Sequence, residues 1–443
     1  MLLQESKNTL NLALPMILGQ LSQILLGLVD AYMVGKLGAT PLAAVALANS
    51  IFSVIMLFGL GLAYALSPIL ANALSKGETK KAAIMLNNSL MLNMIAAIII
   101  AATIFFGANI VFYLNQPPEV SILAKPFLQV IGLSFIPFMV FMTYKQFSEG
   151  LEIVIPPLIA ALLAVPLNIV LNYWLMNSNP GEITFYNGYM GAAYGTFFTR
   201  TAIMVGLMIF VMRKPVFKPF FPRDILPKPK KDVIVRLLKL GIPGGLQWTL
   251  EAGAFSVAAI MMGWIGTKSL AAHNIAINIA VLSFIVVSAL AAASAILISK
   301  ARGEKNYEKV TNIGKSSLVM GIGFMGVCGL ILLLFSHAIA AFFIDDDEVV
   351  RIAAELLVIA AFFQIFDGAQ AVAAGLLRGL EDVKVPTIMI TIAYWVLAIP
   401  MGYVLAFRFQ LNEAGIWYAL SFGLLIVAFL LVKRFFYLSK KLG

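Results

Sequence analysis

The sequence predicts an all-α integral membrane protein, with twelve transmembrane helices arranged as two pseudo-symmetric six-helix bundles. Composition, long apolar runs and an internal repeat lead to this prediction. Of the 443 residues, 61% are hydrophobic and only 12% are charged. A soluble protein has about 25% charged residues, so this chain could not cover a water-facing surface of its own size. We therefore expect lipid to solvate most of its surface, which argues against a soluble enzyme or a nucleic-acid-binding protein.

Apolar runs of about 20 residues, the length that crosses a bilayer as a helix, recur along the chain. A helix also pairs its own backbone amide groups, which lipid cannot do. We place the twelve predicted spans at residues 10–34, 44–73, 84–112, 122–144, 155–177, 188–212, 240–263, 270–299, 312–342, 351–376, 386–407 and 414–433.

The basic residues predict the orientation of these spans. The net charge is +10, from 31 Lys and Arg against 21 Asp and Glu. If the N-terminus is cytoplasmic, most basic residues, Lys145 among them, fall in cytoplasmic connections, as the positive-inside rule requires. Both termini are then cytoplasmic, and the positive charge needs no nucleic-acid partner. Arg200 falls inside a span, and the basic residues on the opposite side are Lys36, Lys125, Lys268, Arg351 and Arg408.

A basic, proline-rich segment divides the predicted spans into two sets of six. Proline breaks helices, and clustered charges resist burial. We therefore predict an N-terminal bundle over residues 1–212, a cytoplasmic linker over 213–239 and a C-terminal bundle over 240–443. The prolines of the linker are Pro215, Pro219, Pro222, Pro227 and Pro229.

The two predicted bundles have related sequences. With a shift of 228 residues, Pro15 aligns with Pro243 and Gly38 with Gly266. Further along, the tripeptide Gly-Leu-Glu occurs at 150–152 and again at 379–381. Because six spans separate the repeats, both begin on the same side of the membrane, which is the parallel arrangement found in many transporters.

Four ionisable side chains fall within the predicted spans, where a charge costs at least about 2.5–3.5 kcal/mol. They are Asp30, Glu251, Asp367 and Arg200. Each could serve only as a structural partner for another polar group. We favour a functional role for the three acids, in cation binding and coupling, and a mainly structural role for Arg200.

Polar neighbours support a role for these acids. Gln247 lies four residues before Glu251, and Gln364 lies three residues before Asp367, so each pair shares a helix face. Asn168 and Asn172 form a similar pair in another span. Their amide oxygens could help to coordinate Na⁺ or hold a protonated acid, although interhelical hydrogen bonding is an equally good interpretation.

A carboxyl group in apolar surroundings can hold a proton, a metal cation or a cationic ligand. One of these must leave before another binds, which is the minimal chemistry of an antiporter. Gln23, Met33, Met261 and Arg200 are candidates for lining a substrate cavity, since methionine adapts to varied apolar shapes. We expect no cofactor beyond a coupling Na⁺ or H⁺, and no phosphate-binding loop for a nucleotide occurs in the sequence.

Three strings of sequence resemble the multidrug and toxic compound extrusion (MATE) family, in particular its bacterial NorM-like branch. They are LLGLVDAYMVGKLG around Asp30, LQWTLEAGAFSVAAIMMGWIG around Glu251 and FQIFDGAQAVAAGLLRGLED around Asp367. The resemblance covers essentially the whole chain. It implies that Glu251 and Asp367 bind the coupling cation, directly as metal ligands if the ion is Na⁺, and that Asp30 is their N-terminal counterpart.

The resemblance also implies a function. Members of this family export lipophilic, often cationic compounds in exchange for Na⁺ or H⁺, by alternating access. It further implies that Phe284 could lie beside the bound cation, although a packing role is as good an interpretation. We therefore expect a multidrug antiporter of the bacterial inner membrane, working as a monomer. The alternatives are a related lipid-linked oligosaccharide flippase and, less well supported, a membrane-embedded enzyme.

Overall fold

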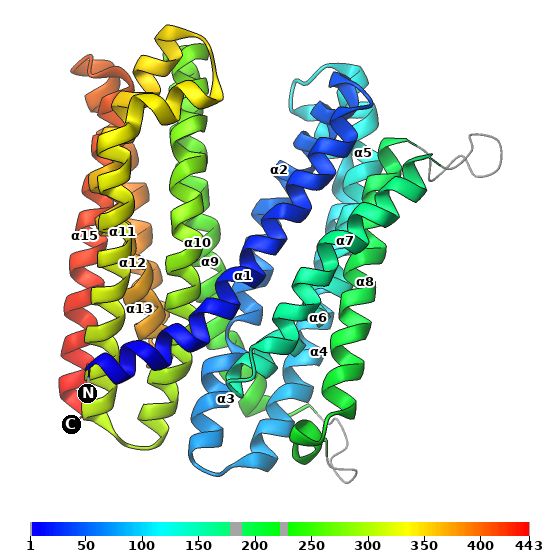
Figure 1. The fold of residues 1–443 in the computed structure, drawn as a ribbon, viewed down its shortest axis with the longest axis vertical. Helices are drawn as coiled ribbons and strands as arrows, with labels where there is room; N and C mark the ends of the chain where they lie inside the picture. Colours follow the sequence, from blue (N-terminus) through cyan, green and yellow to red (C-terminus); the bar gives the residue numbers. More distant parts are fainter. Residues whose placement is uncertain (1, 178–187, 222–228, 443) are drawn as a thin grey trace. The chain divides into compact units, whose positions relative to one another are not determined.

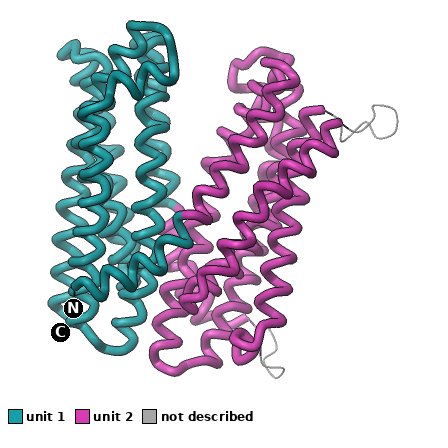
Figure 2. Tube along the Cα trace, viewed as in Figure 1, with its two compact units in different colours: residues 1–17, 246–443 teal, residues 18–245 magenta. Residues whose placement is uncertain are grey.

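The structure is a computed structural model that describes residues 2–177, 188–221 and 229–442, and no strand occurs within them. The described chain forms two compact units, coloured separately in Figure 2. Unit 2 comprises residues 18–245, and unit 1 comprises residues 1–17 together with 246–443.

The first half of the chain supplies most of unit 2 (Figure 1). Its α-helices are α1 (Leu2–Gly35), α2 (Ala39–Ala63), α3 (Leu66–Ser75), α4 (Thr79–Gly107), α5 (Pro118–Leu133), α6 (Phe135–Gly150), α7 (Ile155–Asn177) and α8 (Tyr189–Arg213). Two short 3₁₀ helices, η1 (Ala108–Tyr113) and η2 (Pro215–Phe220), follow α4 and α8.

The second half of the chain supplies most of unit 1. Its α-helices are α9 (Lys231–Ile265), α10 (Thr267–Gly303), α11 (Tyr307–Phe343), α12 (Asp347–Gly379), α13 (Lys384–Thr391), α14 (Ile399–Tyr403) and α15 (Asn412–Leu442). Two π-helical segments, η3 (Ile392–Ala398) and η4 (Val404–Arg408), flank α14.

Within the described residues, twelve helical segments are long and apolar enough to cross a membrane. They coincide with the twelve predicted spans, so the predicted fold class is confirmed. The helices extend past the apolar runs at most ends, because polar residues continue a helix beyond the length that lipid requires.

Both α1 and α9 are divided between the units near a proline. The division in α1 falls after residue 17, close to Pro15, and the division in α9 falls after residue 245, close to Pro243. A proline inside a helix removes one backbone hydrogen bond and favours a bend. These are the prolines that the internal repeat aligned with each other.

Backbone conformation confirms the repeat independently of the sequence matches. Glu152 and Glu381, which the repeat aligns, have φ values of 62° and 64°. Left-handed φ values are uncommon for residues other than glycine, so a matched pair is informative. Gly77 and Lys305, which are 228 residues apart, form a second such pair with φ values of 74° and 57°.

One helix, α7, presents polar side chains inward and large apolar side chains outward. On α7, Asn168 and Asn172 are fully buried, whereas Val170 is 63% exposed and Trp174 is 68% exposed. This reverses the pattern of a soluble protein and suits a surface that faces lipid. Inside unit 1, a Cβ atom at Gly375 of α12 would lie 2.4 Å from the carbonyl oxygen of Ala291, so glycine is needed for the close approach to α10.

The helices are interrupted at different places in the two units. In unit 2, Tyr64 and Ala65 separate α2 from α3, and Ser134 separates α5 from α6. The corresponding spans of unit 1, α10 and α12, are continuous. Conversely, α7 of unit 2 is a regular α-helix, whereas the matching span of unit 1 contains η3 and η4.

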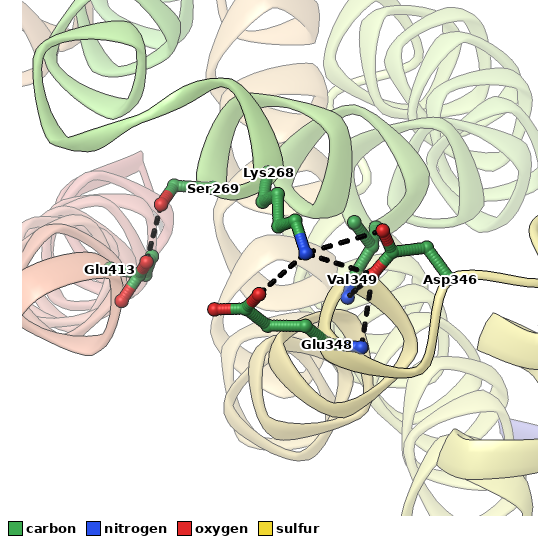
Figure 3. Close-up of polar contacts among 6 residues, drawn as sticks. All are labelled: Lys268, Ser269, Asp346, Glu348, Val349 and Glu413. Atoms are coloured by element: carbon green, nitrogen blue, oxygen red, sulfur yellow. Dashed lines mark hydrogen bonds and ion pairs between the residues drawn. The ribbon is translucent and has the colours of Figure 1, made fainter.

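Polar contacts join three helix ends at one side of unit 1 (Figure 3). Lys268 of α10 places its Nζ 2.5 Å from Glu348 Oε2 and 3.3 Å from Asp346 Oδ2. Asp346 also accepts backbone N–H bonds from Glu348 and Val349, which caps the N-terminus of α12. Ser269 of α10 contacts Glu413 at the start of α15.

The described part of the predicted linker is partly helical. Residues 222–228 lie outside the described residues, but η2 precedes them and α9 begins soon after at Lys231. Phe217 and Phe220 of η2 pack on Phe147 of α6, with ring centroids 6.1 and 5.6 Å away. The linker at 213–239, between bundles at 1–212 and 240–443, stays a prediction.

Candidate cation and substrate sites

The predicted acid of the N-terminal bundle, Asp30, lies inside unit 2 and is 6% exposed. Its Oδ1 accepts a hydrogen bond from Asn172 Nδ2 at 2.6 Å, and its Oδ2 accepts one from Thr196 Oγ1 at 2.7 Å. Asn168 Nδ2 donates to Thr196 Oγ1 at 3.3 Å. The network therefore joins α1, α7 and α8 and uses both oxygens of the carboxyl group as acceptors.

Local sequence explains how these side chains meet. Asn168 and Asn172 are one turn apart on α7, and Asn172 Nδ2 also donates to Asn168 Oδ1 at 3.2 Å. Gly195 of α8 lies directly against them, because a Cβ atom there would be 1.9 Å from Asn172 Oδ1. Sequence analysis predicted both asparagines but missed Thr196, whose hydroxyl is unremarkable in sequence.

Arg200 lies one turn after Thr196 on α8 and is held by its own set of partners. Its Nη1 donates to Ser134 Oγ at 2.7 Å, at the break between α5 and α6. Its Cζ lies 5.2 Å from the ring centroid of Phe52 and 5.1 Å from that of Phe138. Aromatic faces attract cations, so the guanidinium group is accommodated inside unit 2 without a direct ion pair.

The second acidic group lies in unit 1, where Glu251 of α9 and Asp367 of α12 interact electrostatically. Glu251 Oε1 accepts a hydrogen bond from Gln370 Nε2 at 2.6 Å, and Gln370 Oε1 accepts one from Tyr394 Oη at 3.2 Å. Asp367 is 6% exposed, and no described residue donates a hydrogen bond to it. In this region of unit 1, the amide of Gln370 is thus the single described side-chain donor beside two carboxyl groups.

An unused acceptor lies near this acidic pair. Gln364 is 1% exposed, and its Oε1 has no hydrogen-bond partner among the described residues. Gln364 is three residues before Asp367 on α12, so both side chains are on one side of the helix. A buried oxygen without a partner costs about 1–3 kcal/mol. An amide oxygen and two carboxyl groups are suitable ligands for a small hard cation.

The π-helical segment η3 places two aromatic residues at this site. Tyr394 is fully buried, and its ring centroid lies 5.9 Å from that of Phe255 on α9. Trp395 Nε1 donates to the carbonyl oxygen of Leu250 at 2.9 Å, next to Glu251. Segments of π-helix are frequent at functional sites. Sequence analysis missed Tyr394, because an aromatic residue in an apolar run gives no sign of its partner.

The remaining predicted residues are distributed over both units. Met261 and Gln247 are buried in unit 1, at 3% exposure each, and Phe284 is half-buried on α10. Gln23 and Met33 are half-buried on the part of α1 that belongs to unit 2. Their proposed roles as cavity or helper residues stay predictions.

The prediction that Lys145 lies in a connection between spans is wrong, and the side of the membrane on which it lies stays a prediction. Lys145 is 3% exposed within α6, and its Nζ lies 2.8 Å from Oε1 of Glu149, which is 1% exposed. Gln146 Nε2 donates to Glu149 Oε2 at 2.9 Å, and Ser67 Oγ of α3 donates to Gln146 Oε1 at 2.7 Å. The apolar run ends just before Lys145, which gave the appearance of a loop although the helix continues to residue 150.

Within the described residues, no group of three or more His, Cys, Asp or Glu side chains could hold a metal ion. The acidic region of unit 1 contains two carboxyl groups and that of unit 2 contains one, each among amide or hydroxyl groups.

A family model described as MatE matches residues 15–174 and 243–404, one stretch in each sequence repeat. The chain belongs to the MatE family. Relatives agree over nearly the full length. The chain is 35% identical to a probable multidrug resistance protein NorM of Mesorhizobium japonicum, with 97% of this chain and 93% of the relative covered. It is 33% identical to the protein of that name from Rhizobium meliloti, with coverage of 98% and 94%.

Solved MATE structures share the fold. The eukaryotic MATE transporter AtDTX14 superimposes with a TM-score of 0.88 at 19% identity, over 100% of both chains. An outward-facing multidrug resistance MATE family transporter gives a TM-score of 0.88 at 20% identity, with 99% of this chain and 96% of that chain covered. The family match, the relatives and the twelve apolar helices together identify a multi-pass membrane transporter and not an enzyme.

Proposed function

We propose that this MatE protein is a multidrug antiporter that exports lipophilic, often cationic compounds in exchange for Na⁺ or H⁺. The names of its relatives support multidrug export. The observation that carries the coupling mechanism is the acidic pair of unit 1. Among the described residues, Glu251 has a single side-chain donor, the neighbouring Asp367 has none, and Gln364 Oε1 has no partner.

Such a pair is unfavourable unless it takes up positive charge. The buried carboxylate of Asp367 and the half-buried carboxylate of Glu251 repel each other, and neither has a Lys or Arg partner among the described residues. One proton or one Na⁺ would relieve both the repulsion and the desolvation. If the ion is Na⁺, Glu251 and Asp367 would be its carboxylate ligands, and Gln364 Oε1 could complete the set. When the proton or Na⁺ departs, the two carboxylates again repel each other without a compensating positive charge.

Exchange at this site would couple the two fluxes. A cation entering from outside would favour the conformation that releases substrate, and substrate entering from the cytoplasm would favour the conformation that releases the cation. Each charge moved through 100 mV supplies about 2.3 kcal/mol. Candidate residues for substrate contact are Gln23, Met33, Met261 and Arg200, and Phe284 is a candidate helper beside the cation.

A lipid-linked oligosaccharide flippase is less well supported. Such a protein needs basic side chains available to a pyrophosphate group. In unit 2 the half-buried Arg200 already contacts Ser134 and two aromatic rings, and the buried Lys145 is paired with Glu149. We further propose a monomeric protein of the bacterial inner membrane with both termini in the cytoplasm, on the basis of the distribution of basic residues in the connections.

Efflux from vesicles tests the proposed function. A fluorescent lipophilic cation would be followed in vesicles under a Na⁺ gradient or a proton gradient, applied separately. We expect Asp367→Asn and Glu251→Gln each to reduce gradient-driven efflux by about tenfold or more. The exposed Asp345→Asn is the matched control and should be active. Undiminished efflux by both unit 1 variants at normal protein levels would contradict the proposed coupling site.

A further inference from the structure

A buried histidine of unit 1 makes a hydrogen bond that the exchange mechanism does not use. His273 of α10 is 1% exposed, and its Nδ1 accepts a hydrogen bond from Nε1 of Trp417 on α15 at 3.2 Å. The indole N–H can only donate, so Nδ1 carries no proton and the imidazole is in its neutral form. Trp417 is fully buried, and this bond defines the rotation of its ring inside the unit.

Aromatic contacts continue from Trp417 to the acidic pair. The ring centroid of Trp417 lies 5.7 Å from that of Phe363 on α12, and the ring of Phe363 lies 6.0 Å from that of Phe255 on α9. Phe255 in turn lies 5.9 Å from Tyr394 of η3. Centroid separations of about 4.5–7 Å are typical of interacting aromatic rings. We call these five residues, from His273 to Tyr394, the aromatic row.

Two members of the aromatic row lie one helical turn from the acids. Phe255 follows Glu251 by four residues on α9, and Phe363 precedes Asp367 by four residues on α12. Each ring therefore shares a helix face with an acid. The row packs beside the acidic pair on the side where α9 ends and α12 begins.

The last member of the row orients the amide group of Gln370. Tyr394 Oη donates to Gln370 Oε1 at 3.2 Å, and Gln370 Nε2 donates to Glu251 Oε1 at 2.6 Å. A side-chain amide has its acceptor and its donors on different atoms. The tyrosine hydroxyl therefore determines which of these atoms faces the acid.

Removal of the acceptor at His273 would affect the row more than the packing of the helices. The buried indole N–H of Trp417 would have no partner, which is unfavourable, and rotation of the indole toward another acceptor would displace Phe363 in a close-packed interior. A second contact between α10 and α15, that of Ser269 with Glu413, lies one turn away on each helix. These two helices thus keep a direct polar contact when the His273 bond is lost.

We propose that His273 is a positioning residue for the coupling-ion site, which acts through the aromatic row to hold Gln370 in the orientation that serves Glu251. The inference rests on the proposed function, because it takes Glu251 and Asp367 to bind the coupling ion. It follows that a change at His273, four ring contacts from Tyr394, alters the affinity for the ion and leaves the maximal rate of transport unchanged.

The dependence of efflux on the coupling ion tests this proposal. The full-length protein would be reconstituted in proteoliposomes, and efflux of ethidium, a fluorescent lipophilic cation, would be measured over a series of Na⁺ or proton gradients. Asparagine presents an acceptor oxygen near the position of Nδ1, whereas the longer glutamine presents it near that of Nε2. We expect His273→Gln to raise the half-saturating ion concentration by about fivefold at an unchanged maximal rate, and His273→Asn to resemble the wild type. His337→Gln, at the exposed histidine of α11, is the matched control.

A double variant tests whether the effect passes through the row. In a Tyr394→Phe background, His273→Gln should raise the half-saturating concentration by less than about twofold further, because both changes disturb the same amide. Trp417→Phe removes the bond to His273 from its other side and should give a rise of the same order as His273→Gln. This variant keeps the test available if His273→Gln does not fold.

Three results would overturn the proposal. They are equal half-saturating concentrations in His273→Gln and His273→Asn, a full fivefold further rise in the Tyr394→Phe background, and wild-type ion dependence in folded Trp417→Phe. Failure of the proposed function would instead appear as undiminished efflux by Asp367→Asn and Glu251→Gln, whatever the His273 variants do.

Discussion

In unit 2, Asp30 accepts a hydrogen bond at each carboxyl oxygen, whereas in unit 1 Asp367 accepts none from the described residues. The charged groups near these acids also differ between the two units. Asp30 has Arg200 in its vicinity, and the Lys145–Glu149 pair of unit 2 is internally balanced. Glu251 and Asp367 have only each other. The two units therefore surround their acids differently: Asp30 is held by donors from α7 and α8, whereas Asp367 has no described donor.

The repeat makes this difference more instructive. The shift of 228 residues that aligns the two halves places Glu251 opposite Gln23, not opposite Asp30. The acidic groups therefore did not arise as copies of a single ancestral position. The helix irregularities also differ, with broken spans around Ser134 and Tyr64 in unit 2 and π-helical segments in unit 1. Each unit has its irregular backbone beside its own buried polar groups, as is usual where side chains or polar groups disturb a helix.

The largest expected effect on stability would come from removing one half of the balanced pair in unit 2. We expect Lys145→Met to lower the free energy of unfolding by about 3–5 kcal/mol, because Glu149 would be left buried without its cation. Thermal unfolding in detergent would measure the loss. Lys145→Met combined with Glu149→Met should recover most of it, and the exposed Lys315→Met is the control. A single variant as stable as the wild type would show that this pair is not balanced as described.

A smaller effect is expected from Asp30→Asn. The amide would offer Asn172 or Thr196 one acceptor in place of two, and an unpaired buried donor costs about 1–3 kcal/mol. We therefore expect a lower unfolding temperature, with efflux that stays measurable when expressed per folded molecule. If efflux fell as far as it does in Asp367→Asn at equal protein levels, the contrast between the two units would be lost.

Removal of the Tyr394 hydroxyl tests how much this group contributes to the position of Glu251. Tyr394→Phe removes the donor to Gln370 Oε1, which helps to orient the amide group toward Glu251. A lost hydrogen bond of this kind is worth about 1 kcal/mol, or roughly fivefold in affinity. We expect weakening of that order in the dependence of efflux on the coupling ion. Tyr403→Phe, at a 49% exposed tyrosine in the same span, should change nothing.

The smallest effect concerns the exposed end of α12. Backbone N–H bonds, chiefly that of Val349, and the nearby Lys268 hold the pKa of Asp346 below its ordinary value of 3.8. This cap is fully formed above about pH 4 and is lost as the pH falls through the lowered pKa. Amide hydrogen exchange in the first turn of α12 should therefore be constant from pH 7 to about pH 5, after correction for intrinsic rates, and increase in more acid solution. Asp346→Asn should remove most of that acid dependence, and an unchanged profile would contradict it.

The spans could be predicted from the sequence because a helix that crosses the bilayer needs about 20 apolar residues, and runs of that length are visible in the local composition. The repeat was detectable because matched prolines and glycines mark matched backbone features. The acids were found because charge is rare in such a chain. Thr196 and Tyr394 were not found, because their roles depend on which helix lies opposite. Lys145 was misplaced because the end of an apolar run does not mark the end of a helix.

The π-helical segments of unit 1 also bear on how one span can move. A π turn includes about one more residue than an α turn of similar length. Conversion of η3 to regular α-helix would rotate the following residues by about 100° around the helix axis. Such a rotation would change which side chains of α14 and η4 face the other helices of unit 1. This span thus contains an extra residue in its π turn that its counterpart α7 lacks. Deletion of a single residue in η3 would remove that extra residue.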